Sequence, residues 1–173
     1  MLAHIEDLSY NVYGDHMASK TNAVRLVQQA GIPVQESFYE YNEQDLSGIH
    51  VANAIGMEPE RVFKTLVARG ERTGINVFCI PVCCELDLKK AAKAAGDKNM
   101  ELIHVKELLP ITGYIRGGCS PVGMKKKYPT FLDETAVLWD IIAISAGERG
   151  HQMLLSPDML AHFLGAEFVE LIL

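Results

Sequence analysis

Apolar residues recur along the chain in short runs, and glycine, proline and small polar residues separate one run from the next. Between 23 and 30 the apolar positions repeat at the spacing of one helix face, with Ser19 as a candidate N-cap and Gly31 as a stop. A short helix is also predicted around Glu107. The same cap signals predict helices that begin after Ser47, Asp87 and Ser156.

Runs rich in β-branched and aromatic residues predict the strands. These runs lie at 33–41, 62–68, 75–82, 137–145, 151–155 and 167–172, with a further one around Leu102. Strands and short helices are interspersed without the steady rhythm of β-α-β units, and no internal repeat is present. The pattern therefore predicts one mixed α/β domain, in which short helices flank a curved, partly barrel-like mixed β-sheet.

The first 16 residues differ from the rest because they are polar, acidic and aperiodic. The pair His16-Met17 is typical of a cloning junction, which favours an expression leader at 1–16 and a natural domain at 17–173. A natural disordered N-terminus is the alternative. Three of the 22 acidic residues lie in this segment, so the rest of the chain carries 16 basic and 19 acidic residues, a net charge of −3.

The composition is that of a soluble globular protein, because 49% of the 173 residues are hydrophobic and 22% are charged. The net charge of −6 excludes a global positive field, so a nucleic-acid partner would need a local basic patch. No apolar run reaches the roughly 18 residues that a membrane span needs, and no signal peptide precedes the domain. The four cysteines lack C-x-x-C spacing and paired histidines, which predicts reduced thiols, no metal site, no cofactor and a cytoplasmic location.

Lys64 is the first candidate for chemistry, because nearly every neighbour in the run 62–68 is apolar. A lysine in such a strand is either an edge residue whose amine reaches water or an amine held at the wall of a pocket. A partly desolvated amine could hold a carbonyl, a phosphate or a terminal adenosine. The spacing alone leaves both interpretations open.

A glycine-rich stretch at 113–123 is the second candidate. Gly117 and Gly118 would let the backbone approach a ligand closely, and their N–H groups could stabilise the negative charge that develops on an ester carbonyl. The phosphate-binding patterns G-x-x-x-x-G-K-[ST] and G-x-G-x-x-G are both absent. An ordinary bulged loop is the alternative.

A basic run follows this loop and consists of Lys125, Lys126 and Lys127. Three consecutive lysines could contact the phosphates of a nucleic acid, even in an acidic protein. A solvated turn is the alternative.

Ser145 stands where an apolar strand ends, but it lacks the G-x-S-x-G setting of a nucleophile. It is interpreted as a positioning hydroxyl, with a plain turn as an equal rival. Tyr39 is either a core or rim aromatic or a platform on which a base or ribose could stack. Cys119 is interpreted as a buried small residue, because no histidine or asparagine is placed to activate it.

Taken in order, these pieces resemble the YbaK/EbsC family of aminoacyl-tRNA deacylases from about Lys20 to the C-terminus. The matching motifs are Phe63-Lys-Thr-Leu66, Pro81-Val82 and the segments 85–93, 112–123 and 145–150. The resemblance implies a mixed α/β domain with a curved central sheet, similar to the editing domain that is inserted in bacterial prolyl-tRNA synthetases. It also implies a free-standing domain that acts in trans.

The resemblance further implies a role for individual residues. The family's key lysine falls on Lys64, and its G-x-x-x-P loop falls on the segment from Gly117 to Pro121. The implied catalytic residues are Lys64, Gly117 and Gly118, and the implied substrate-binding residues are Tyr39, Thr65, Pro121, Ser145 and Gln152. Some YbaK-type members have an aspartate where this chain has Gln152, so the amino acid that is removed stays open.

The implied reaction is the hydrolysis of mischarged Cys-tRNA(Pro), in which the thiol of the substrate cysteine attacks the ester and no protein nucleophile is needed. Mischarged tRNA is the implied partner, contacted by the basic run, and prolyl-tRNA synthetase is a candidate second partner. One alternative is a deacylase for alanine or serine, which Gln152 leaves open. The other is a non-catalytic module that binds tRNA or a synthetase, and the presence of Lys64 with the glycine-rich loop argues against it.

Overall fold

The computed structural model describes residues 20–173. The expected leader at 1–16 and the expected start of the domain at Met17 lie outside these residues.

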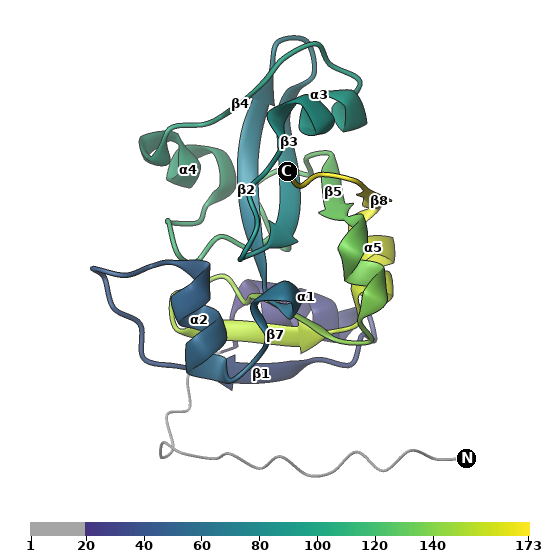
Figure 1. The fold of residues 1–173 in the computed structure, drawn as a ribbon. Helices are drawn as coiled ribbons and strands as arrows, with labels where there is room; N and C mark the ends of the chain where they lie inside the picture. The colour runs from purple at the N-terminus through teal and green to yellow at the C-terminus, as the bar shows by residue number, and fades with distance from the viewer. Residues whose placement is uncertain (1–19) are drawn as a thin grey trace.

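Five strands form the larger sheet, in the order β4-β2-β3-β5-β8. Its centre is a long antiparallel hairpin, made of β2 (Phe63–Gly70) and β3 (Gly74–Pro81). The other strands are β4 (Met100–Leu102), which pairs with β2, and β5 (Thr130–Asp133) and β8 (Glu167–Val169), which run parallel to β3. Figure 1 shows α3 (Leu88–Ala95) and β4 beside the far end of this hairpin.

Three further strands form a separate antiparallel sheet, in the order β1-β7-β6. They are β1 (Gln35–Phe38), β6 (Ile142–Ser145) and β7 (His151–Leu155). A single parallel bridge between Val62 and Ala143 links this sheet to the start of β2. The mixed α/β domain is therefore confirmed, but the barrel-like sheet is wrong. Across residues 20–173 the strands divide into two open sheets, and no ladder returns from the last strand to the first.

The helices begin at side-chain caps and most of them end at glycines. Thr21, rather than Ser19, caps α1 (Asn22–Gln29), because its Oγ1 accepts the N–H of Val24. The predicted caps Ser47, Asp87 and Ser156 are confirmed for α2 (Gly48–Ile55), α3 and α5 (Pro157–Leu164). The helix predicted around Glu107 is α4 (Val105–Thr112). Within residues 20–173 no helix has both the length and the apolar character to cross a membrane.

The segment 130–145 differs from its prediction. The sequence predicted one strand at 137–145, whereas the chain forms β5, a 3-10 helix at Glu134–Leu138 and only then β6. Buried Asp133 ends β5, because its Oδ1 accepts the N–H and the hydroxyl of Thr135 while Oδ2 accepts the N–H of Leu171. The last bond comes from a distant part of the chain, so the local pattern could not indicate it.

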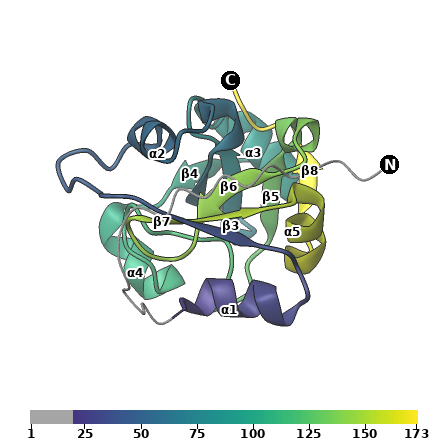
Figure 2. The same ribbon diagram turned by 90° about the horizontal axis from the view of Figure 1, so that it is seen from below.

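Two helices cover opposite faces of the three-stranded sheet, as Figure 2 shows from below. On one face α1 packs in the cluster that contains Ile144 and Met153. On the other face α2 packs through Ala52 in the cluster that contains Ala143 and Leu154. Further along the same strands, the face that α2 covers carries residues that the sequence predicted for the site.

Candidate functional site

Lys64 is the second residue of β2 and is half-buried. Two positions earlier, Val62 forms the bridge to Ala143 of β6. Because side chains alternate along a strand, Lys64 and Ser145 each lie two residues beyond this bridge, on the same face. The bridge thus places two predicted site residues, far apart in the sequence, on the same side of two neighbouring strands.

Three polar side chains cross the smaller sheet on this face. Ser37 of β1 pairs with Gln152 of β7, and Gln152 pairs with Ser145 of β6. Directly paired residues share a face of the sheet, so the three side chains form a row. We call Ser37, Lys64, Ser145 and Gln152 the polar wall.

Gln152 is the most constrained member of the polar wall. Its side chain is 4% exposed, and its Oε1 has no hydrogen-bond partner among residues 20–173. Leaving a buried acceptor unpaired costs about 1–3 kcal/mol. The Oγ of Ser145, in contrast, accepts the N–H of Gly147 at 3.1 Å. A bound ligand that offers a donor to Gln152 would therefore remove an existing cost.

Tyr39 lies beside the polar wall. It follows β1, and the alternation of side chains puts it on the same face as Ser37. Its N–H donates to the carbonyl of Gly150 at 3.0 Å, and a Cβ on Gly150 would lie only 2.7 Å from the Tyr39 carbonyl oxygen. This close packing fixes Tyr39 against the turn that joins β6 to β7.

The glycine-rich loop at 113–123 packs against that turn, which spans 146–150. A Cβ on Gly118 would lie 3.1 Å from the Cα of Glu148, so only glycine fits without a shift of the backbone. Arg149 fastens the two segments, since its Nε donates to the carbonyl of Arg116 at 2.9 Å. The predicted loop is therefore built for close backbone contact, and the turn beside the polar wall is one of its neighbours.

The two predicted catalytic glycines have different constraints. Gly117 has a φ of 87°, and a Cβ there would lie 3.3 Å from both Leu46 Cδ2 and Arg149 Nε. The N–H of Gly118 donates to the carbonyl of Ile115 at 3.0 Å, so this donor is engaged within the loop.

Thr65 lies on the opposite face of β2 from Lys64, because side chains alternate along the strand. Its Oγ1 is 3.8 Å from the Sγ of Cys79.

Burial raises the pKa of the Cys79 thiol to about 12, and it raises the pKa of the Cys119 thiol to about 12 as well. Both thiols therefore stay protonated near neutral pH. Residues 20–173 contain no group of three or more histidine, cysteine, aspartate or glutamate side chains placed to hold a metal ion.

Pro121 and the basic run lie around a second hollow. Pro121, Lys126 and Lys127 line a cavity of about 240 Å³, together with Phe163 and other residues from 123–130 and α5. All three lysines of the run are exposed, and Lys125 Nζ donates weakly to the carbonyl of Pro110 at 3.4 Å. The structure thus groups Pro121 with the lysines rather than with the polar wall.

Sequence reasoning missed several residues that shape the site. The Tyr114 hydroxyl donates to the Val122 carbonyl, and a Cβ on Gly147 would lie 2.9 Å from the Tyr114 ring, so this tyrosine joins the loop to the turn. His151 contacts Glu148, a pair whose i, i+3 spacing was a usable signal.

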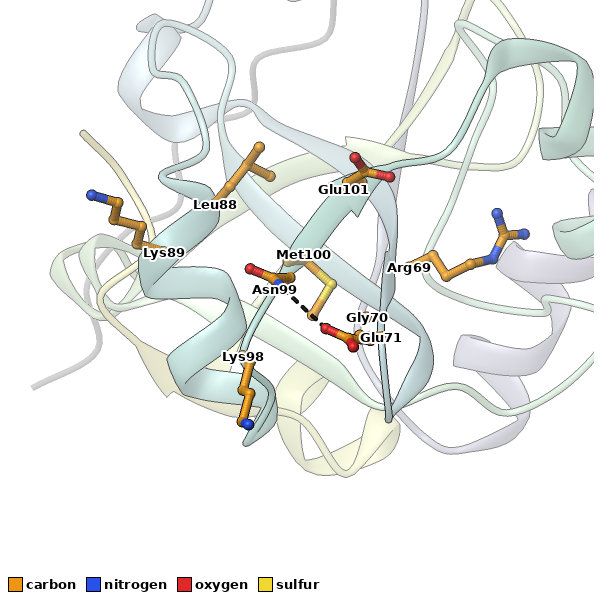
Figure 3. Close-up of a pocket in the computed structure, with 9 residues that line it drawn as sticks. All are labelled: Arg69, Gly70, Glu71, Leu88, Lys89, Lys98, Asn99, Met100 and Glu101. Atoms are coloured by element: carbon orange, nitrogen blue, oxygen red, sulfur yellow. Dashed lines mark hydrogen bonds between the residues drawn. The ribbon is translucent and has the colours of Figure 1, made fainter.

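A larger hollow lies elsewhere, at the far end of the β2–β3 hairpin. This open cavity of about 620 Å³ is lined by Arg69, Gly70, Glu71, Leu88, Lys89, Lys98, Asn99, Met100 and Glu101. Figure 3 shows Asn99 directed at Glu71, to which it donates at 3.0 Å. Arg69 is bound to Glu107 at 2.9 Å. No predicted site residue lines this cavity, and its walls carry both basic and acidic side chains.

The fold and the site define a class: a mixed α/β domain with a partly buried polar wall, whose neighbouring turn packs against a glycine-rich loop. The chain belongs to the family of aminoacyl-tRNA editing domains, because the model of that family matches residues 48–163. The sequence-based assignment to this family, and to its deacylases, is thereby confirmed.

Individual relatives make the likeness more specific. The chain is 48% identical over 152 residues to EbsC of Enterococcus faecalis, whose name describes a candidate Cys-tRNA(Pro)/Cys-tRNA(Cys) deacylase; the match covers 88% of this chain and 93% of the relative. A solved structure, described as a candidate trans-editing enzyme for prolyl-tRNA synthetase, is 26% identical with a TM-score of 0.73, over 88% of this chain and 98% of that one. A proline–tRNA ligase of Brachyspira hyodysenteriae is 23% identical over 63% of this chain and 20% of its own length.

Proposed function

We propose that this chain hydrolyses mischarged aminoacyl-tRNA in trans and that Cys-tRNA(Pro) is its preferred substrate. The observation that carries the proposal is the polar wall, with the unpartnered Oε1 of Gln152 at its centre. The aminoacyl group of a charged tRNA carries an α-ammonium group, which is a donor for such an acceptor. Binding would therefore place the ester next to Gln152, Ser145 and Lys64.

The reaction uses the nucleophile of the substrate. Cys79 and Cys119 stay protonated because burial raises the pKa of each thiol to about 12. The Ser145 hydroxyl oxygen already accepts a hydrogen bond from a backbone N–H, so one of its lone pairs is engaged and it is a poor nucleophile. The substrate thiol attacks the ester carbonyl, a C–S bond forms, the C–O bond to the ribose breaks, and the thiol proton passes to the ribose oxygen. Water then hydrolyses the cyclic thioester to cysteine.

Lys64 and the glycine-rich loop supply the electrostatic part of this proposal. The half-buried ammonium group of Lys64 holds the ester or the terminal adenosine against the polar wall, where a partly desolvated charge acts more strongly than in water. The backbone of the loop around Gly117 approaches the substrate closely and offers N–H donors to the developing oxyanion. Both effects favour the transition state over the bound ester.

The proposed partners are tRNA and prolyl-tRNA synthetase. The chain carries a net charge of −6, so the exposed run from Lys125 to Lys127 is its local contact with tRNA phosphates. Binding to free tRNA should consequently be weak and should fall steeply with salt. A complex of tRNA with the synthetase is the proposed target, because relatives of this chain include a proline–tRNA ligase and a protein described as its trans-editing enzyme.

The test compares the hydrolysis rates of Cys-tRNA(Pro), Ser-tRNA(Pro) and Ala-tRNA(Pro), each with and without prolyl-tRNA synthetase. We expect Cys-tRNA(Pro) to be hydrolysed fastest, because a thiol is a much better nucleophile than a hydroxyl near neutral pH and alanine has neither. Faster hydrolysis of Ala-tRNA(Pro) would exclude thiol assistance and favour a deacylase that uses water. No hydrolysis of any of the three above the rate without protein would favour a binding module.

A further inference from the structure

A buried histidine with two carboxylate partners lies on the face of the three-stranded sheet opposite the polar wall. His151 is 2% exposed, its Nδ1 is 2.8 Å from Glu148 Oε1 and its Nε2 is 2.9 Å from Glu36 Oε1. The ring of Phe38 stacks on the imidazole, with 4.2 Å between the ring centroids. We call His151, Glu36 and Glu148 the histidine clamp.

The geometry of the clamp gives both ring nitrogens of His151 a carboxylate partner at hydrogen-bond distance. An ionised carboxylate only accepts hydrogen bonds, so a ring nitrogen that carries a hydrogen donates to its glutamate. A buried polar ring is tolerated when its polar atoms are hydrogen-bonded, and both nitrogens of His151 have a partner. Hydrogen bonds in which a partner is ionised are about twice as strong as neutral ones.

The clamp holds the frame of the proposed site. Ser145 and Gln152 are a directly paired couple, and the turn 146–150 joins them. Glu148 belongs to that turn and packs against Gly118 of the glycine-rich loop. Glu36 comes from β1, so the clamp joins β1 to the turn through the first residue of β7.

We infer that His151 is a positioning residue for the editing reaction: clamped between Glu36 and Glu148, it fixes the turn 146–150 against the glycine-rich loop and sets Gln152 in the polar wall. The inference rests on the proposed function. His151 acts through its neighbours, because its own side chain lies on the other face of the sheet from Gln152. Two carboxylates from separate segments make the turn rigid without placing a further charge next to the ester.

The kinetic test uses Glu148→Gln, with Glu43→Gln as its matched control. Glu148 is half-exposed, so its replacement should leave a folded protein. Glu43 contacts the same turn through Arg149, but at 3.7 Å and with an exposed side chain. We expect Glu148→Gln to lower kcat on Cys-tRNA(Pro) about tenfold, the change that the loss of one charge-assisted hydrogen bond of about 1.4 kcal/mol would give. KM should stay within about twofold of the parent value, and Glu43→Gln should match the parent in both constants.

A spectroscopic test is independent of activity. The ¹⁵N signals of the His151 ring, assigned by their disappearance in His151→Gln, report the hydrogen bonds of its two nitrogens. In Glu148→Gln the Nδ1 signal should shift, whereas in Glu43→Gln it should stay at its parental position. An unchanged Nδ1 signal in Glu148→Gln would overturn the inference, and so would a parental kcat in that variant. If the parent hydrolyses no mischarged tRNA, the proposed function fails, whereas the ¹⁵N result still decides whether the clamp exists.

Discussion

The open cavity at the end of the hairpin and the polar wall on the α2 face of the three-stranded sheet differ in what lines them. The cavity is wide, at about 620 Å³, but Arg69 is bound to Glu107 and Glu71 accepts from Asn99. In the polar wall Ser145 and Gln152 are buried and Lys64 is half-buried, yet Gln152 Oε1 is an acceptor without a partner among residues 20–173. Size indicates where a molecule could fit, whereas an unsatisfied buried group indicates where one would be stabilised.

The conformational requirements of the two regions differ in the same way. Most of the side chains that line the cavity are exposed, and Figure 3 shows Lys89 and Lys98 at its outer edges. The polar wall is built on paired strands, and its loop and turn fit together through glycines. A site that must hold an ester in one orientation needs the second kind of frame.

Lys64→Ala should give the largest effect on activity. Removal of the half-buried amine should lower kcat/KM on Cys-tRNA(Pro) about 100-fold or more, as for the loss of one group that stabilises a developing oxyanion. Lys98→Ala, in the open cavity, is the matched control and should retain parental activity. Release of labelled cysteine measures the rate, and circular dichroism checks that both variants are folded. Near-parental hydrolysis by Lys64→Ala would remove the polar wall from the mechanism.

Gly117→Val should lower both activity and stability. The φ of 87° and the neighbours at 3.3 Å add strain to any side chain at this position. A non-glycine residue in this conformation costs about 1–2 kcal/mol. Gly74→Val is the control, since Gly74 has a φ of 72° but no atom within 4 Å of an added Cβ. It should lose stability in a denaturant titration and keep its activity; equal activity losses in the two variants would show that strain alone is responsible.

Asp97→Asn should affect stability without affecting activity. The Asp97 carboxylate accepts the N–H groups of Thr73, Arg72 and Lys98, which hold its pKa well below the usual range. A lowered pKa in the folded state stabilises the protein above the unfolded value of about 3.9, and this stability is lost as the pH falls through the native pKa. The variant should therefore melt at a lower temperature at pH 7, and the difference should shrink in acid. A difference that is constant with pH would contradict this account.

Selective alkylation of thiols should give the smallest effect. Cys83 is exposed. Burial raises the pKa of the Cys84 thiol to about 11 and the pKa of each of the Cys79 and Cys119 thiols to about 12. Thiolates react and thiols do not, so iodoacetamide should modify Cys83 first. Mass spectrometry of digested protein measures the order. The Sγ of Cys83 lies 3.7 Å from that of Cys84, which is a neighbour of Lys64, so alkylation at Cys83 should reduce hydrolysis modestly. Cys83→Ser should retain its activity under the same treatment.

Local rules account for most of the fold that the sequence predicted. The caps at Ser47, Asp87 and Ser156 are confirmed because a hydroxyl or carboxylate bonds to an N–H only two or three residues away. The strands of the β2–β3 hairpin are also correct, because their apolar runs are long. The prediction failed around Asp133, where a buried carboxylate receives an N–H from Leu171.

By itself the sequence determined the family, and it singled out Lys64 and the glycine-rich loop as candidate site residues, because these are short motifs whose members are neighbours in the chain. Tertiary structure decided that Lys64 and Thr65 lie on opposite faces, that Ser37, Gln152 and Ser145 form one row, and that the sheets stay open. It also decided the partners of His151, one of which comes from a distant strand. The physical reason is that strand register and burial depend on segments far apart in the chain, and pairing across such distances leaves no periodicity to detect.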